Sequence, residues 1–133
     1  MKLFHLSDLH IGKQLHRYNL AAEQRKTLAQ IVALAKSEHP DAILIAGDIY
    51  DTPVPSAEAV SVFDAFLSAL CEIEPQIAVM IIAGNHDSAR RIDFASSILA
   101  KHEVYITGLP PMQEGETIRR VTLADGYGEV DFY

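Results

Sequence analysis

Three short, mostly apolar runs in this chain each end in a cluster of polar residues. A run of this length is typical of a strand that is buried in a sheet. Amide, imidazole and carboxylate groups at the mouth of a buried strand are costly unless something binds them, and a pair of metal ions is the favoured candidate. The runs are residues 2–7, 41–46 and 77–82, followed by Asp8-Leu9-His10, by Gly47-Asp48 through Asp51, and by Gly84-Asn85-His86-Asp87.

Helical patterns alternate with these runs. Asn19 is predicted to cap a helix that continues to about Ser37. Ser56 is predicted to cap a second helix, which ends before Pro75. A shorter helix is predicted from about Asp93 to Ala100. Alternation of strand and helix up to residue 107 predicts an α/β fold with a mainly parallel sheet built from βαβ units. In such a sheet, ligands are expected at the carboxyl ends of the strands.

We expect one face of each helix to contribute to the core, because apolar residues recur at helical spacing. The first strand is expected to be buried on both faces, with His5 packed in the core and Cys71 partly buried. The expected inward-facing helix residues are Leu28, Ile31, Val32 and Ala35, then Ala59, Val62, Phe63, Phe66, Leu67 and Leu70, then Phe94, Ala95, Ile98 and Leu99.

The C-terminal part predicts further strands. Val104–Thr107 fits a fourth strand of the first sheet. Thr117–Leu123 and Glu129–Tyr133 fit two strands joined by a turn at Asp125-Gly126, which would begin a second sheet.

Charge and cysteine content limit the classes of function. A formal net charge of -7 disfavours a broad surface for nucleic acid, so any such contact would be local or helped by cations. Lys13, His16, Arg17, Arg90 and Arg91 could form a small cationic rim for a DNA backbone, although an ordinary solvated loop explains them equally well. A single cysteine excludes an intrachain disulfide and a Cys-based zinc site.

Nothing in the sequence resembles a secretory leader or a membrane span, so we expect a soluble cytoplasmic protein.

Two of the polar clusters have simple geometric interpretations. In an extended segment residues i and i+2 share a face, so Asp8 and His10 could bind one ion. Gly47 permits a tight turn that would place Asp48 in the same crevice, and Asp51 could orient a neighbouring imidazole. The alternative is an Asx-type turn at each aspartate with a solvated His10.

The order D-x-H, G-D-x-x-D, G-N-H-D resembles the calcineurin-like metallophosphoesterases. Within that family, Ser7–Gly12, Ala46–Thr52 and Gly84–Ser88 are most similar to nuclease subunits of bacterial relatives of the double-strand-break repair nucleases. The resemblance implies that residues 1–133 form the N-terminal part of a β-sandwich flanked by helices. It also implies a metal-dependent DNA nuclease subunit that acts in repair and recombination.

The resemblance also implies residue roles. Asp8 and His10 would bind one ion, Asn85 a second, and Asp48 both. Two ions about 3.5–4 Å apart can activate a water and hold the phosphate. His86 would stabilise the transition state or protonate the leaving oxygen, with Asp51 orienting its ring. The donor set suits manganese, iron or zinc, and the family likeness favours manganese.

The chain departs from the family pattern in lacking a further isolated histidine and a G-H-x-H pair. Beyond His86 its only histidine is His102, which we expect at the surface. We therefore expect a truncated N-terminal part of a longer nuclease domain, with weak or single metal occupancy and little activity alone.

The family likeness implies DNA as substrate, an ATPase partner with long coiled coils, and a homodimer of nuclease subunits. Two alternatives remain open. One is a phosphatase or a small phosphodiesterase with the same metals, and the other is a metal-poor scaffold that serves as a binding module.

Overall fold

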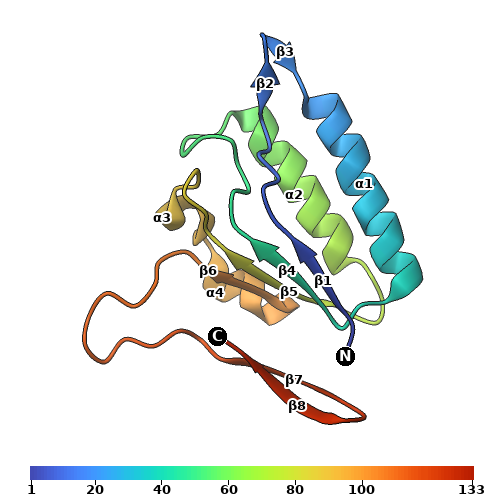
Figure 1. The fold of residues 1–133 in the computed structure, drawn as a ribbon, viewed down its shortest axis with the longest axis vertical. Helices are drawn as coiled ribbons and strands as arrows, with labels where there is room; N and C mark the ends of the chain where they lie inside the picture. The colour runs from blue at the N-terminus through green and yellow to red at the C-terminus, as the bar shows by residue number, and fades with distance from the viewer.

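A four-stranded parallel sheet forms the centre of the molecule in the computed structural model, which describes residues 1–133 (Figure 1). Its order is β1-β4-β5-β6. This confirms the α/β fold and the mainly parallel sheet. The strands are β1 (Leu3–Leu6), β4 (Ala42–Ala46), β5 (Ala78–Ile82) and β6 (Val104–Thr107).

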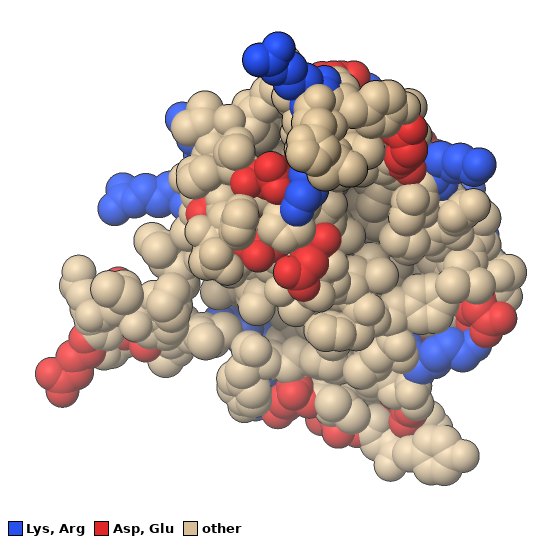
Figure 2. Space-filling view, turned by 45° about the horizontal axis from the view of Figure 1, so that its top comes forward, with Lys and Arg blue, Asp and Glu red and all other residues tan.

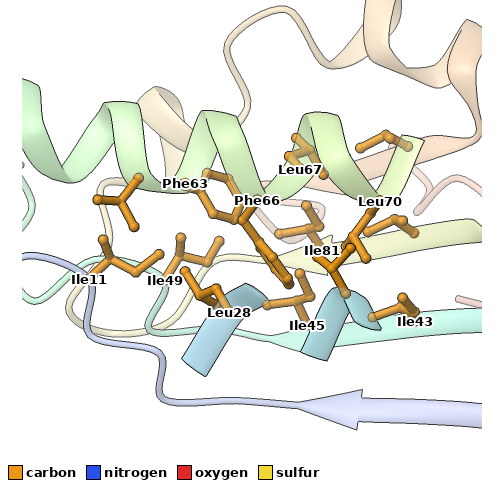
Figure 3. Packing of buried hydrophobic residues seen from close by; sticks show 14 of the residues in the cluster. Ile11, Leu28, Ile43, Ile45, Ile49, Phe63, Phe66, Leu67, Leu70 and Ile81 are labelled. Atoms are coloured by element: carbon orange, nitrogen blue, oxygen red, sulfur yellow. The ribbon is translucent and has the colours of Figure 1, made fainter. Parts of the chain in front are cut away.

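Two long helices, α1 (Ala21–Glu38) and α2 (Ala57–Cys71), pack against one face of this sheet. Figure 3 shows Phe66 and Leu70 pointing from α2 toward the strand residues Ile45 and Ile81. Fully burying one such side chain contributes about 1.5–3 kcal/mol, so this layer holds the sheet in place. All six predicted inward-facing residues of α2 are buried, as are Leu28, Val32 and Ala35 of α1.

The helix starts were predicted with unequal accuracy. Ser56 caps α2 as expected, because its hydroxyl accepts a hydrogen bond from the Ala59 N–H at 3.2 Å. Helix α1 begins later than predicted, with Leu20 at its N-cap. Asn19 still contributes there, since its side-chain oxygen accepts from the Ala21 N–H at 2.9 Å.

The first strand is less buried than predicted. Leu3 is 42% exposed and His5 is exposed, so the predictions of a two-sided buried strand and of a core histidine are wrong. The exposed Leu3 and His5 alternate with Phe4 and Leu6, which pack against the core, so the exposed pair lies on the sheet face opposite the long helices. Strand β1 is also an edge strand that pairs only with β4.

The helix predicted over residues 93–100 is also wrong in form. The segment contains α3 (Ala89–Ile92), α4 (Ser96–Leu99) and a 3-10 turn, η1 (Ala100–His102). Ala95 has a left-handed backbone with φ 61°, which interrupts the helix. As a result, Phe94 is 81% exposed and Ile98 is 62% exposed instead of facing the core.

Two antiparallel hairpins complete the fold. The loop expected after His10 contains β2 (Gln14–Leu15) and β3 (Tyr18–Asn19), joined by His16 and Arg17 with positive φ. Such a turn matches the twist of paired strands.

The second hairpin, β7 (Val121–Asp125) and β8 (Gly128–Phe132), forms the expected small sheet, although its first strand begins at Val121 and not at Thr117 as predicted. It lies against the sheet face opposite the long helices, and Val121 and Phe132 line a cavity there with Leu44 and Met80. The N-terminal ammonium also donates to the Asp125 carboxylate. None of the helices combines the length and the apolar character needed to cross a membrane.

Candidate metal centre

The three polar clusters meet at the carboxyl edge of the parallel sheet, where the loops after β1, β4 and β5 leave it. The first two loops are joined by backbone hydrogen bonds beyond the strand ends. The Asp8 N–H donates to the Gly47 carbonyl at 3.2 Å, and the His10 N–H donates to the Asp48 carbonyl at 2.9 Å. The backbone itself therefore brings the first two clusters together.

Asp8, His10 and Asp48 form one potential ligand group. The His10 Nε2 atom lies 3.8 Å from Asp8 Oδ1 and 4.0 Å from Asp48 Oδ2. Asp48 is 9% exposed and is the only charged residue among the buried ones, whereas Asp8 is exposed. The ligand atoms of the two carboxylates and the imidazole lie within 4.8 Å of one another.

The extended geometry expected for Asp8 and His10 is not found. Both residues have positive φ, 56° and 43°, and so does Asp48 at 50°. A left-handed backbone costs roughly 1–2 kcal/mol in a non-glycine residue, and such residues cluster at functional sites. The proximity of the two side chains therefore results from strained turns held by the neighbouring loop, and not from strand alternation.

Two glycines allow the loops to approach this closely. A Cβ atom on Gly84 would lie 2.2 Å from Asp48 Oδ1, and one on Gly47 would lie 2.8 Å from Gly84 Cα. The His86 N–H donates to Asp48 Oδ1 at 2.8 Å, which fixes that carboxylate. The need for glycine was predicted at position 47 but missed at position 84. The place of Gly84 directly before the Asn-His-Asp cluster was the available signal.

His10, Asp51 and His86 form a second group. The two imidazole rings meet edge to face with centroids 4.8 Å apart. Asp51 contacts both rings. Its backbone carbonyl lies 2.9 Å from His86 Nδ1. Its carboxylate instead faces His10, with Asp51 Oδ1 3.3 Å from His10 Nδ1.

Asp87 has a different environment from its neighbours. Its carboxylate accepts hydrogen bonds from the N–H groups of Ile49, Tyr50 and Gly84 at 3.1, 2.9 and 2.9 Å. Burial, together with the nearby charge of Asp87, raises the pKa of Tyr50 to about 12, so the phenol stays neutral. Asp87 thus ties the second loop to the third.

The residues fit a bound divalent cation. His10 Nδ1 is buried without a hydrogen-bond partner, and both ring nitrogens of His10 face carboxylates. Lys13 places a cationic group at the margin of the cluster, with its Nζ 3.9 Å from Asp51 Oδ1. Carboxylate oxygens with imidazole nitrogens suit manganese, iron or zinc, and a cation would offset the gathered negative charge.

The remaining predicted site residues lie at the surface. Asn85 is exposed on the loop that carries His86, which is also exposed. His102 is exposed in η1, as expected, and belongs to neither ligand group. The five cationic rim residues lie on the β2–β3 hairpin and its approach and on α3.

Comparisons with known proteins identify a family and two relatives. The model of the calcineurin-like phosphoesterase family matches residues 1–130. The chain is 36% identical over 134 residues to the SbcD subunit of nuclease SbcCD from Staphylococcus saprophyticus, covering 100% of this chain and 33% of that protein. The SbcD subunit from Staphylococcus epidermidis is 38% identical over 106 residues, covering 80% of this chain and 28% of that protein. The chain therefore spans about a third of the length of these relatives.

Proposed function

Because this chain belongs to the calcineurin-like phosphoesterase family, we propose that it is the N-terminal part of a metal-dependent DNA nuclease subunit similar to SbcD. The observation that carries the proposal is the meeting of Asp8, His10 and Asp48 at one sheet edge, with His86 against them. Family membership implies divalent-metal binding, and manganese is the ion we propose.

The ligand roles that we propose are those implied by the family resemblance. Asp8 and His10 Nε2 would hold one ion, Asn85 would hold a second, and Asp48 would contribute to both. A pair of such ions supplies an activated water and neutralises charge on the phosphate. We propose Nε2 as the ligand atom of His10 because it is the ring nitrogen that faces both Asp8 and Asp48. Histidines from the rest of a longer nuclease domain would complete the ligand shell.

His86 is the proposed proton donor. A carbonyl oxygen only accepts, so the contact with the Asp51 carbonyl places a proton on His86 Nδ1. The opposite nitrogen, Nε2, is then free to take up a proton and to pass it to the leaving oxygen of a phosphodiester. The backbone N–H of His86 donates to Asp48 Oδ1, which holds this residue beside that carboxylate.

The charge distribution supports local contact with DNA. Lys13, His16, Arg17, Arg90 and Arg91 are the proposed rim, and all five are exposed. In Figure 2 the Lys and Arg side chains protrude separately, with Asp and Glu between them, and form no continuous basic face. We therefore propose a few backbone contacts beside the metal centre, in keeping with the net charge of -7.

The relatives are named as one subunit of nuclease SbcCD, which supports proposing an SbcC-like ATPase partner for this chain. We also propose a homodimer of nuclease subunits and a cytoplasmic location.

Substrate choice tests the proposal. In the full-length protein we expect manganese-dependent cleavage of DNA ends to exceed turnover of a small aryl phosphodiester. Preference for the aryl compound would favour a small phosphodiesterase, and an absence of both metal binding and turnover would favour a scaffold.

The role of His86 is tested separately. We expect His86→Ala to abolish cleavage and to leave manganese affinity largely intact, while the exposed-histidine control His102→Ala keeps full activity. Unchanged cleavage by His86→Ala would contradict the proton-donor role.

A further inference from the structure

Gln24, in the first turns of α1, contacts the metal-centre loop with its whole amide group. Its Nε2 donates to the His10 carbonyl at 2.7 Å and to the Leu9 carbonyl at 3.3 Å. Its Oε1 accepts from the Gly12 N–H at 3.0 Å. One side chain thus binds the backbone on both sides of His10.

The loop around His10 is hydrogen-bonded from two sides, by β4 and its following loop and by α1. On the β4 side, the N–H groups of His10 and Ile11 donate to the carbonyls of Asp48 and Ile49 at 2.9 and 2.8 Å. Gln24 holds the same segment from the helix side. Helix α1 is itself fixed by the buried residue Leu28, one turn further on, so the amide has a rigid base.

These hydrogen bonds surround His10, the residue shared by the two potential ligand groups. His10 has a left-handed backbone and belongs to both potential ligand groups. A glutamine that satisfies the carbonyls of Leu9 and His10 offsets the cost of that backbone conformation.

We propose that Gln24 is a positioning residue that holds His10 in the orientation needed to bind a divalent metal ion. The inference rests on the proposed metal role of His10 but not on DNA as the substrate. Groups that orient a metal ligand typically change metal affinity by about 10- to 100-fold when replaced.

The test is manganese affinity of the full-length protein, measured by calorimetric titration without DNA. Gln24→Met keeps the length of the side chain and removes all its hydrogen bonds, so affinity should fall about 10- to 100-fold. The Gln24→Glu side chain can still accept from the Gly12 N–H but cannot donate to the His10 carbonyl, so the manganese affinity of this variant should fall by a similar factor. The control is Gln30→Met, at an exposed position of the same helix, which should bind as the wild type does.

Each outcome decides the inference. Affinity of both Gln24 variants within twofold of wild type would overturn it, and so would a lower melting temperature of the metal-free protein with unchanged affinity. Wild-type affinity in Gln24→Glu would assign the effect to Gly12 and also overturn it. If Gln24→Met does not fold, Gln24→Glu alone decides. Failure to cleave DNA would contradict the proposed function but would leave this affinity test intact.

Discussion

At the scale of single residues, the site depends on close backbone approach as much as on its polar side chains. Gly84 leaves room for the Asp48 carboxylate, and Asp87 binds the N–H groups of Gly84, Ile49 and Tyr50. The left-handed backbone of Asp8 and of His10 could not be predicted, because the D-x-H pattern is equally compatible with a strand end. The residue types were therefore predictable, and the way in which they meet was not.

Gly84→Ala should disturb both stability and metal binding. The new methyl group would overlap Asp48, and overpacking of this kind typically costs about 1–3 kcal/mol in free energy of unfolding. Denaturant unfolding and manganese titration would measure the two effects. Gly126→Ala is the matched control, since a Cβ atom there meets nothing within 4 Å. Equal behaviour of the two variants would show that the loops do not need this contact.

At the scale of elements, α1 and α2 were predictable because long apolar stripes at helical spacing leave few alternatives. The segment after Asp87 was not, since the left-handed Ala95 divides it into short turns that expose Phe94 and Ile98. The edge position of β1 could not be predicted from the sequence either, because strand order depends on contacts between distant segments. Local patterns thus predict the long elements and not their environment.

Removing the cap of α2 should weaken the core layer. Ser56→Ala loses the hydrogen bond to the Ala59 N–H and should cost about 1 kcal/mol in free energy of unfolding. Ser61→Ala, on the exposed face of the same helix, should change stability by less than about 0.5 kcal/mol. Chemical denaturation of both variants checks this, and equal losses would mean that the cap contributes nothing specific.

At the scale of the whole molecule, the alternation of strand and helix places three separated sequence clusters at one edge. That arrangement was predictable from the sequence, because parallel strands share the direction of their carboxyl ends. The β2–β3 hairpin was not predictable from the sequence. It carries the exposed Arg17 in its turn and follows the His10 loop along the chain. The molecule therefore combines an acidic candidate metal centre with a small hairpin that carries exposed His16 and Arg17.

Arg17→Glu should weaken DNA binding by the full-length protein and make it less sensitive to salt, because one phosphate contact is lost. The slope of log affinity against log salt should fall by about one. Lys36→Glu, in the last turn of α1, makes the same change in net charge and should leave the slope unaltered. A common effect of both variants would point to net charge and not to a contact at the hairpin.

The central claim is that the three loops form a divalent-metal centre. Crystals of the full-length protein grown with manganese, and an anomalous difference map recorded at the manganese edge, test it directly. We predict a strong peak within bonding distance of Asp8, His10 and Asp48, with any second peak beside Asn85. A map with no peak among these residues, or with its strongest peak elsewhere on the chain, would contradict the assignment.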